Sequence, residues 1–389
     1  MTDNNENKVL NVPHLRFPEF SGEWETKSIN DLADVIGGGT PDTTVKSYWD
    51  GGIQWFTPSE IGKNKFVDAS LRTITEDGLN NSSAKLLPPN TLLLSSRATI
   101  GECSLSLREC ATNQGFQSLV SKNCNVDFLY YLIQTKKKDL IRKSCGSTFL
   151  EISANEVRKI QVSVPSDVEQ QKIAELLSLI DKRIATQNKI IEDLKLLKSA
   201  ISLNVLHSGT WKQFKIKDIA QIGRGRVISS IEISQQKNPT YPVYSSQTSN
   251  DGIMGYLDDY MFEGEYISWT TDGANAGTVF YRDGKFNCTN VCGLLKLLNG
   301  FDTHFVSLIL AEATKKYVSI NLANPKLMNN IMGNIQICLP EFEEQKRISI
   351  VFKKLQELLD VQKILLNQYS KQKQCLRLCQ NVGTTSFIF

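Results

Sequence analysis

The sequence predicts an α+β protein in which two mostly β domains are each followed by a long helix. The two helices are expected to pair as an antiparallel coiled coil with pseudo-twofold symmetry. A helix start near Pro165 recurs near Pro340, both starts continue into heptad patterns, and strand-like segments with glycine turns precede each of them. The predicted division is 1–164 and 206–339 for the domains, 165–205 and 340–380 for the helices, and 381–389 for a tail.

The first element of the repeat is the helix start itself. Pro165 ends the preceding segment, Asp167 is expected to cap the helix, and acidic residues and glutamine occupy the first turn. The same order of residue types returns in the second half. The matched pairs are Pro165 and Pro340, Glu169 and Glu344, Gln170 and Gln345, Lys172 and Arg347, and Ile173 and Ile348.

The second element is an apolar seam with alternating steps of four and three residues, which is typical of a coiled coil. The predicted seam positions are Ile173, Leu177, Ile180, Ile184, Gln187, Ile191 and Leu194 in the first helix, and Ile348, Phe352, Leu355, Leu359, Gln362, Leu366 and Tyr369 in the second. Both seams are interrupted at matching places, first by Gln187 and Gln362, then by Lys198 and Lys373. An antiparallel pairing would place Gln187 opposite Gln362, and such a polar layer sets register and direction. The alternative is two unrelated amphipathic helices, each packed on its own domain.

The segments that open the two domains are also similar. Residues 24–39 and 211–225 align Trp24 with Trp211, Ile29 with Ile216, Asp31 with Asp218 and Ala33 with Ala220. Residues 206–210 are the expected joint. Segments 51–62, 90–107 and 265–286 have the alternation and glycine turns of strands, whereas 127–142 and 303–316 are expected to be short helices.

Composition limits the possible classes of protein. The chain has 389 residues, 41% of them hydrophobic, and a net charge of only +3 from 44 basic and 41 acidic residues. No apolar run approaches the ~20 residues that cross a bilayer, and the polar N-terminus lacks a signal-peptide core. We therefore expect a soluble, cytoplasmic protein without membrane contact. Nine cysteines without a CxxC pair and three histidines offer no metal-ligand set.

Three stretches come close to catalytic motifs without matching them. Residues 238–241 read Asn-Pro-Thr-Tyr, which is similar to the Asn-Pro-Pro-Tyr loop of adenine methyltransferases, but no cofactor-binding segment precedes them. Asp42 and the 60–63 stretch lack the spacing of a metal-dependent nuclease core, in which the acid and the lysine stand two apart. Residues 37–40 lack the ending of a phosphate-binding loop. We predict no catalytic residue, no metal site and no cofactor.

The remaining polar features suit nucleic-acid binding, and each has a simpler alternative. Arginine forks can reach phosphates or guanine edges, and a lysine cluster on a helix suits phosphate contacts. A solvated basic turn, a solvated helix face or a core aromatic would explain the same residues, and Trp55 is expected to be a core aromatic. The candidate DNA-binding residues are Lys46, Tyr48, Trp49, Arg97, Lys136, Lys137, Lys138, Arg224, Arg226, Asp272 and Asn275.

Taken together, these features resemble the specificity subunits of Type I restriction-modification systems. The resemblance rests on residues 37–62, 113–120 and 146–153, on the two helix starts, and on a second half that resembles a recognition domain of another subclass. It covers roughly residues 12–380, and the order of two domains and two helices is its most specific part. The tail after Gln380 departs from the pattern.

The resemblance implies a protein that is not an enzyme by itself. It implies that each target-recognition domain reads one half of a bipartite, asymmetric sequence in double-stranded DNA. The helices would space the domains and dock two methyltransferase subunits, through which restriction subunits join. Those partners use S-adenosylmethionine to methylate adenine and ATP to cleave unmodified DNA.

Two other classes are possible on the sequence alone. One is a coiled-coil assembly scaffold without DNA recognition, which would show no salt-dependent DNA binding. The other is a self-sufficient methyltransferase-nuclease, which would need a cofactor-binding domain.

Overall fold

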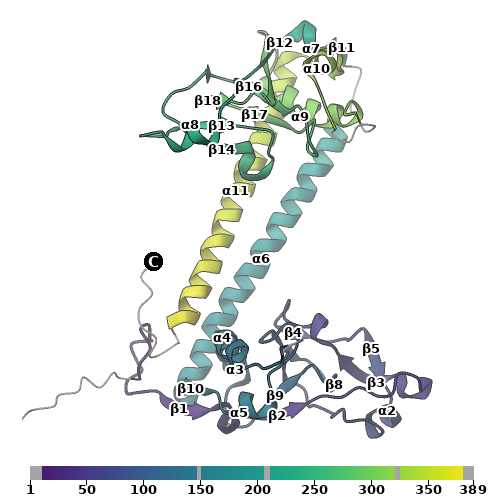
Figure 1. Cartoon of the computed structure of the whole chain (residues 1–389), viewed down its shortest axis with the longest axis vertical. Coiled ribbons are helices and arrows are strands. Elements are labelled where there is room, and N and C mark those ends of the chain that lie inside the picture. The colour runs from purple at the N-terminus through teal and green to yellow at the C-terminus, as the bar shows by residue number, and fades with distance from the viewer. Residues whose placement is uncertain (1–10, 147–149, 206–210, 320–324, 380–389) are drawn as a thin grey trace, which may run out of the picture. The chain divides into compact units, whose positions relative to one another are not determined.

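The computed structural model describes residues 11–146, 150–205, 211–319 and 325–379, with the side chains of 204–205 and 378–379 excepted (Figure 1). The predicted joint at 206–210 and the predicted tail at 381–389 lie outside these ranges. The chain divides into two compact units: unit 1 is residues 1–189 with 364–389, and unit 2 is residues 190–363. Each unit thus combines one β-rich part with segments of both long helices, because an amphipathic helix needs a partner for its apolar stripe.

Unit 1 contains a five-stranded sheet of order β2-β9-β6-β7-β4, a three-stranded sheet of order β5-β3-β8, and a two-stranded ribbon of β1 and β10. Its strands are β1 Glu25–Ser28, β2 Ala33–Gly37, β3 Trp49–Phe56, β4 Phe66–Val67, β5 Arg72–Ile74, β6 Leu92–Leu94, β7 Cys103–Ser106, β8 Cys110–Thr112, β9 Gln117–Ser121 and β10 Gln161–Val164. Its short helices are α1 Ile29–Leu32, η1 Lys46–Tyr48, η2 Pro58–Glu60, α2 Glu76–Asn80, α3 Val126–Thr135, α4 Lys137–Arg142 and α5 Ala154–Arg158.

Unit 2 has two four-stranded sheets, of order β12-β19-β16-β17 and β14-β13-β18-β15, and a ribbon of β11 and β20. Its strands are β11 Lys212–Lys215, β12 Ala220–Arg224, β13 Tyr241–Tyr244, β14 Ile253–Leu257, β15 Phe262–Glu263, β16 Tyr266–Thr270, β17 Val279–Arg282, β18 Lys285–Cys288, β19 Cys292–Leu297 and β20 Gln336–Leu339. Its short helices are α7 Ile216–Ile219, α8 Ser230–Ser234, η3 Ser249–Gly252, α9 Thr303–Ala313, η4 Thr314–Lys316 and α10 Asn329–Asn334.

The two units repeat one framework. Strands β2-β9-β6-β7 of unit 1 and β12-β19-β16-β17 of unit 2 have the same order, and in each unit a ribbon strand, β1 or β11, is followed by a four-residue helix. The helices begin at Ile29 and Ile216, and the next strands begin at Ala33 and Ala220. These are the residues that the two opening segments align, so their sequence similarity reflects a structural repeat.

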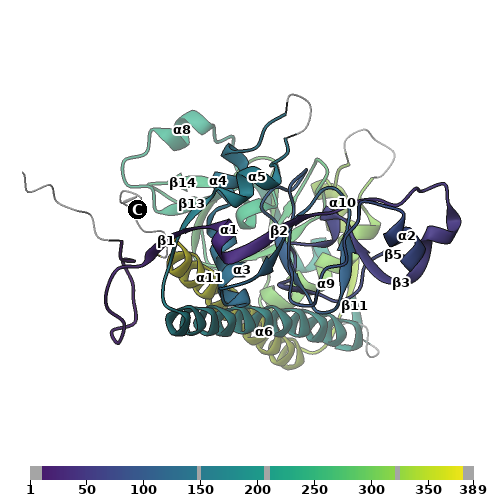
Figure 2. The same cartoon turned by 90° about the horizontal axis from the view of Figure 1, so that it is seen from below.

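The units differ in their second sheets. In unit 1 this sheet is formed by β3, β5 and β8, and its strands β3 and β5, with α2 beside them, lie away from α5, as Figures 1 and 2 both show. We call it the distal sheet of unit 1. In unit 2 the second sheet has a fourth strand, β15, whereas its parallel pair, β13 with β18, matches the parallel pair β3 with β8 of unit 1.

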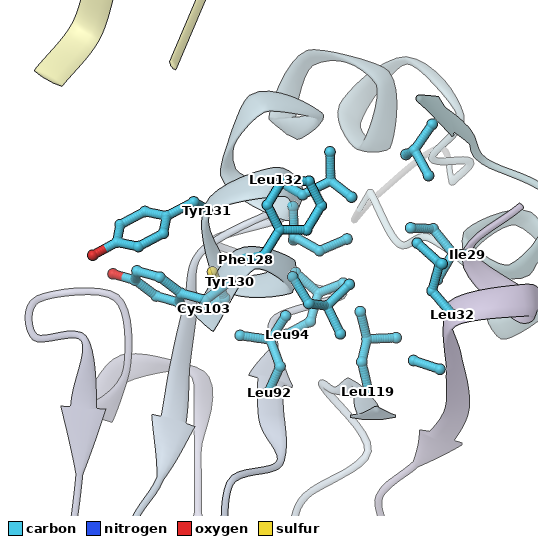
Figure 3. Close-up of a cluster of buried hydrophobic side chains, with 14 of the residues drawn as sticks. Ile29, Leu32, Leu92, Leu94, Cys103, Leu119, Phe128, Tyr130, Tyr131 and Leu132 are labelled. Carbon is cyan, nitrogen blue, oxygen red and sulfur yellow. The ribbon is translucent and has the colours of Figure 1, made fainter. Parts of the chain in front are cut away.

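The main core of unit 1 lies between the five-stranded sheet and helix α3 (Figure 3). Phe128 of α3 faces Leu92 and Leu94 of β6, and Leu132 and Tyr131 of the same helix belong to the same buried cluster. The predicted helix over 127–142 is two helices, because Lys136 leaves helical geometry with φ −92° and ψ 7° between α3 and α4. In unit 2, the corresponding core joins α9 to β16 and β19 through Phe305, Trp269 and Leu295.

The long helices are α6, Asp167–Val205, and α11, Phe342–Cys379. Every predicted seam position is buried or half-buried. Within unit 1, Lys373 Nζ lies 2.5 Å from Asp181 and the Arg183 guanidinium lies 5.8 Å from the Tyr369 ring, so the segments run antiparallel. The pairing of Gln187 with Gln362 stays a prediction, because those residues belong to different units.

The two lysines that interrupt the seam have equivalent contacts. Lys373 pairs with Asp181 in unit 1, and Lys198 Nζ donates to Gln356 Oε1 at 2.8 Å in unit 2. Asp181 and Gln356 occupy the same place in the helix repeat, so the two contacts are related by the pseudo-twofold symmetry. Burial lowers the pKa of Lys198, which faces a neutral amide. Both lysines therefore bridge the helices at matching places.

The repeated glutamine connects each long helix to its own domain. Gln170 Nε2 donates to Pro165 O at 3.1 Å, and its Oε1 accepts the Asn125 N–H at 2.9 Å. Gln345 makes the same bonds to Pro340 O, at 2.8 Å, and to the Asp302 N–H, at 3.0 Å. Asn125 and Asp302 cap α3 and α9. Each buried glutamine thus holds the start of a long helix against the start of the helix that covers its sheet.

The cap of α6 differs from the predicted one. The helix begins at Asp167, and the Gln170 N–H donates to Ser166 O, so Ser166 occupies the capping position. Asp167 instead lies in the first turn, where its Oδ1 accepts a hydrogen bond from Gln170 Nε2 at 3.3 Å. Its negative charge still suits the positive end of the helix dipole.

Across the described ranges, no helix combines the length and apolar character needed to cross a membrane.

We expect Gln170→Ala to destabilise unit 1 by about 1–3 kcal/mol, because it leaves a buried carbonyl and a partly buried N–H without their partner. Gln171→Ala is the matched control, since Gln171 is exposed and contacts only Glu175 of its own helix. Chemical denaturation of both variants measures the difference. Equal midpoints for the two variants would contradict the structural role of Gln170.

A histidine joins α9 to α11 in unit 2. His304 Nδ1 lies 3.0 Å from Ser349 Oγ, and its ring packs edge-on against Tyr281 at 5.1 Å between centroids. Burial lowers its pKa to about 4, and Lys353 and Lys198 act in the same direction against Asp302 and Glu265. Protonation of His304 is therefore unfavourable in the folded state.

The expected pH dependence follows from the direction of this shift. The folded pKa lies below the ordinary value of 6.5. As the pH falls, His304 therefore binds a proton at a higher pH in the unfolded chain than in the folded chain. The contribution of neutral His304 to the free energy of unfolding is fully present above pH 6.5 and is lost as the pH falls towards 4. We expect a loss of about 1–2 kcal/mol for this half-buried group after allowance for solvent screening. Urea titrations of His304→Gln should show a flatter profile, and an unchanged slope would contradict the assignment.

Candidate nucleic-acid interface

The repeated framework brings equivalent segments together at one end of each main sheet. We call this the sheet end: the end of β2, the turn after β6 and the residues before β9 in unit 1, and the end of β12, the turn after β16 and the residues before β19 in unit 2. In unit 1 the Ile152 N–H donates to Ser96 O at 3.1 Å, and in unit 2 the Leu327 N–H donates to Thr271 O at 2.8 Å. The turns that contain Arg97 and Asp272 therefore have the same setting.

A glycine holds the sheet end together in each unit. A Cβ on Gly38 would lie 2.3 Å from Thr112 O, and one on Gly225 would lie 1.6 Å from Cys288 O. The following residues, Gly39 and Arg226, donate their N–H groups to the same two carbonyls at 2.8 and 3.2 Å. Only glycine allows this close approach of two backbones.

The side chains around this glycine differ between the units. Unit 1 has Gly37 and Gly39 at the two positions where unit 2 has Arg224 and Arg226. Arg224 Nε donates to Asn329 Oδ1 at 2.9 Å, and its Nη1 lies 3.4 Å from Asn290 O. Unit 2 thus has guanidinium groups at its sheet end where unit 1 has two glycines, of which Gly37 is exposed and Gly39 is buried against Ser83.

Arg226 is exposed and paired with an acid. Its two terminal nitrogens donate to the two carboxylate oxygens of Glu232, one of them at 2.9 Å. This hydrogen-bonded pair raises the pKa of Arg226 and lowers the pKa of Glu232. In the same unit, Asp272 is half-buried and forms a backbone bridge with Lys326, whereas Asn275 is exposed. The sheet end of unit 2 therefore gathers Arg224, Arg226, Asp272 and Asn275.

In unit 1 the sheet end has fewer free charges than the sequence predicts. Arg97 Nε lies 2.8 Å from Glu151, and Lys137 pairs with Glu102 of the same turn. Burial lowers the pKa of Lys136, which follows α3. Lys138 is exposed. Of the predicted lysine cluster, Lys138 is the member best placed to contact a phosphate.

The loop residues Lys46, Tyr48 and Trp49 lie at the distal sheet of unit 1, and their environments differ. Lys46 is exposed and Tyr48 is half-buried, but Trp49 is only 7% exposed and packs edge-on against Trp55 at 5.1 Å. Trp49 is therefore a core aromatic, which corrects its assignment as a surface contact, and Trp55 is the core aromatic that the sequence predicts. The physical reason is that β3 begins at Trp49, whose side chain packs into a buried cluster with Trp55, Ile74, Ala84 and Ala111.

One residue that the sequence reasoning missed lies directly over Trp49. The Arg72 guanidinium is 3.5 Å from the centroid of the Trp49 ring. The available signal was an arginine in a strand-like segment between the segment that contains Trp49 and Trp55 and a helix start. The pairing of β3 with β5 was needed to bring Arg72 and Trp49 together.

The near-matches to catalytic motifs have structural roles. Asp42 Oδ1 accepts hydrogen bonds from the Thr44 N–H and hydroxyl, and Glu60 accepts from Thr57 and from the Leu71 N–H. Residues 238–241 lead into β13, where the Thr240 N–H donates to Leu257 O. Within the described ranges no group of three or more His, Cys, Asp or Glu side chains is arranged to hold a metal ion. The cysteines whose side chains are described are free thiols.

Two copies of one β-rich domain, each joined to a long helix by the same buried glutamine, define a tandem binding protein with two unlike surfaces. The family model described as "Type I restriction modification DNA specificity domain" matches residues 21–196 and 208–368. The chain therefore belongs to the Type I restriction-modification specificity family and carries two copies of its domain.

Individual relatives agree with this family. The MjaIX specificity subunit of Methanocaldococcus jannaschii is 38% identical over 182 residues, which are 45% of this chain and 42% of that protein. A putative type I specificity subunit of Mycoplasma pneumoniae, S.MpnORF365P, is 36% identical over 206 residues, 51% of this chain and 76% of that protein. The chain thus spans less than half of the M. jannaschii relative.

A solved structure shows the same fold. The crystal structure of the S subunit of a Type I system from M. genitalium has a TM-score of 0.68 at 18% identity, with coverage of 96% of this chain and 100% of that chain.

Two glycine pairs provide a matched stability test of the sheet ends. We expect Gly225→Ala to destabilise unit 2 by about 1–3 kcal/mol or more, because the new Cβ collides with a backbone carbonyl. Gly223→Ala should have a much smaller effect, since a Cβ there meets nothing within 4 Å. In unit 1, Gly38→Ala and Gly37→Ala form the corresponding pair. Denaturation midpoints test both pairs, and equal effects within a pair would contradict the close-approach role.

Proposed function

We propose that this chain is the DNA specificity subunit of a Type I restriction-modification complex. Each domain would read one half of a bipartite, asymmetric target in double-stranded DNA, and the chain itself would not be catalytic. The observation that carries this proposal is one framework used twice with different surfaces. Gly37 and Gly39 stand where the second domain has Arg224 and Arg226, and the second sheets differ in strand number. Two domains that share a framework but differ in their surface residues are suited to two different half-sites.

The chemistry of the candidate residues supports binding more than catalysis. Guanidinium groups can bind phosphates or guanine edges bidentately, and exposed lysines contribute phosphate contacts that carry no sequence information. Arg224, Arg226, Asp272 and Asn275 would form the contact surface of the second domain. Lys46, Tyr48, Arg97 and the 136–138 lysines would contribute to that of the first, with Lys138 the least engaged of the three. Trp49 is buried and would contribute indirectly, by supporting the surface residues above it.

The partners would dock on the long helices. Two methyltransferase subunits would bind there, and restriction subunits would join through them. Large apolar side chains on the outer faces of the helices support this assignment, since exposed apolar surface marks protein contacts. They include Leu179 in unit 1, at 57% exposed, and Leu196 and Leu203 in unit 2, at 69% and 68%. The methyltransferase subunits would use S-adenosylmethionine as their cofactor. The complex would act in the cytoplasm, on the DNA of the cell.

The proposal is tested by co-expression of this chain with a cognate methyltransferase subunit, followed by mapping of methylated adenines in the host DNA. A bipartite motif with a constant unread gap is the expected result. A stable complex without any methylated motif would contradict the proposal. Binding to DNA at several salt concentrations then tests the scaffold alternative, which predicts no binding, whereas a specificity subunit should lose affinity steeply as salt increases.

The length of the helices makes a further prediction. Insertion of one heptad into both α6 and α11 should lengthen the unread gap of the motif by roughly three base pairs. Seven residues add about 10 Å of helix, and the base-pair rise is about 3.4 Å. Mapping of methylated adenines in cells that express the extended chain measures the gap. An unchanged gap would rule out the helices as the spacer.

A further inference from the structure

Arg72 lies on an edge strand of unit 1 and is held by an aromatic surface. Strand β5 is the outer strand of the β5-β3-β8 sheet, and Arg72 is exposed on it. Its guanidinium carbon lies 3.5 Å from the centroid of the Trp49 ring and 5.9 Å from that of Trp55. Stacking on an aromatic face uses the flat side of the guanidinium and leaves the N–H donors along its edge available.

The tryptophan beneath Arg72 is itself firmly placed. Trp49 Nε1 donates to Asp42 O at 3.1 Å, and the ring packs edge-on against Trp55. Trp55 Nε1 donates in turn to Gly39 O at 2.9 Å. Both rings are buried, so the surface under Arg72 has little freedom to move. The guanidinium is therefore oriented before any ligand arrives, which reduces the entropy lost on binding.

Other arginines of unit 1 are already engaged by acids. Arg97 pairs with Glu151, Arg108 binds both oxygens of Asp68, and Arg142 pairs with Asp139. For Arg72, no carboxylate of the described residues lies within ion-pair distance. The two acids nearest in sequence are Asp68, which is bound by Arg108, and Glu76, which lies in the first turn of α2. Glu60 binds Thr57 and the Leu71 N–H. Arg72 thus presents an oriented fork without a partner of opposite charge.

The neighbours of Arg72 suit a groove of DNA. Leu71 is 87% exposed, which is exceptional for a large apolar side chain, and apolar side chains contact base edges such as the thymine methyl group. The Lys46–Tyr48 turn lies beside the end of β5, where the Thr75 N–H donates to Tyr48 O at 3.0 Å and the Thr75 hydroxyl donates to Ser47 O at 2.8 Å. Lys46 of that turn is exposed and adds positive charge.

We propose that Arg72 is a specificity-determining residue of the first domain and that it reads a guanine through its N7 and O6 acceptors. Trp49 is the positioning residue that orients it. This inference rests on the proposed function, because it assigns a role within a DNA-reading surface. A bidentate arginine–guanine contact distinguishes bases by about 1–3 kcal/mol, which is roughly 5- to 150-fold in affinity.

The test uses the complex of this chain with its methyltransferase subunit and a duplex that contains the mapped motif. Each guanine of the half-site read by the first domain is replaced in turn by 7-deazaguanine, which lacks the N7 acceptor. We expect one position at which this replacement weakens binding of the wild-type complex by roughly 5- to 150-fold. At that position, the replacement should have no further effect on Arg72→Ala.

Three variants sharpen the test. Arg72→Lys keeps the charge but loses the fork, so it should lose the preference for guanine and keep most of the salt dependence. Trp49→Phe keeps an aromatic face and should weaken the discrimination less than Arg72→Ala does. Arg108→Ala is the matched control, since Arg108 is exposed and bound to Asp68. Thermal denaturation of each variant checks that the fold of unit 1 is intact.

Several outcomes would overturn the inference. A wild-type complex that binds its motif while Arg72→Ala keeps both affinity and preference would refute it and leave the proposed function standing. An equal loss across all sequences, with a smaller salt slope, would assign Arg72 to a phosphate and refute the reading of guanine. A wild-type complex without sequence preference would contradict the proposed function and the inference together.

Discussion

A buried side-chain amide at the start of each long helix is the contact on which the architecture depends. Gln170 and Gln345 each bind a proline carbonyl at the helix start and the backbone N–H of the residue that caps the domain's covering helix. The amide group has a donor and an acceptor at a fixed separation, so it holds two chain segments at one distance and one angle. Because the bond to the proline carbonyl is buried and the bond to the N–H is partly buried, loss of the side chain leaves two backbone groups without their partner. This contact sets the direction in which each long helix leaves its domain. The heptad seam then holds the helix in that direction along its length.

The two domains also share one structural framework. The framework strands, the four-residue helix after the first ribbon strand and the glycine at the sheet end are common to both units. What differs is attached to that framework: the number of strands in the second sheet, and the residues on either side of the repeated glycine. A rigid backbone contact, such as Gly38 against Thr112 or Gly225 against Cys288, allows the neighbouring side chains to change without moving the strands. Such an arrangement suits a protein whose two halves must bind different sequences.

Burial and pairing alter the meaning of individual residues at the candidate interface. Trp49, Arg97 and Lys137 all have side chains that suit DNA contacts, yet Trp49 is in a core and the other two are paired with Glu151 and Glu102. Arg72 has no distinguishing motif in the sequence, but strand pairing places it on Trp49 with an unpaired fork. Whether a basic residue can contact DNA therefore depends on which of its hydrogen-bond donors remain unpaired in the folded domain.

The sequence by itself determined the repeat, the long helices, the positions of their seams and the family. These features depend on the spacing of apolar residues and on the repeated helix starts, and both are patterns of residues that lie close together in the chain. It also indicated that Asp42, Glu60 and residues 238–241 lacked the spacing of catalytic motifs. Only the tertiary structure decided the role of Gln170, the core position of Trp49, the ion pairs of Arg97 and Lys137, and the place of Arg72. Each of those depends on a partner far away in the chain, such as Asn125 for Gln170 or Glu151 for Arg97. Contacts of that kind exist only after strands have paired and helices have packed, and a local pattern does not record them.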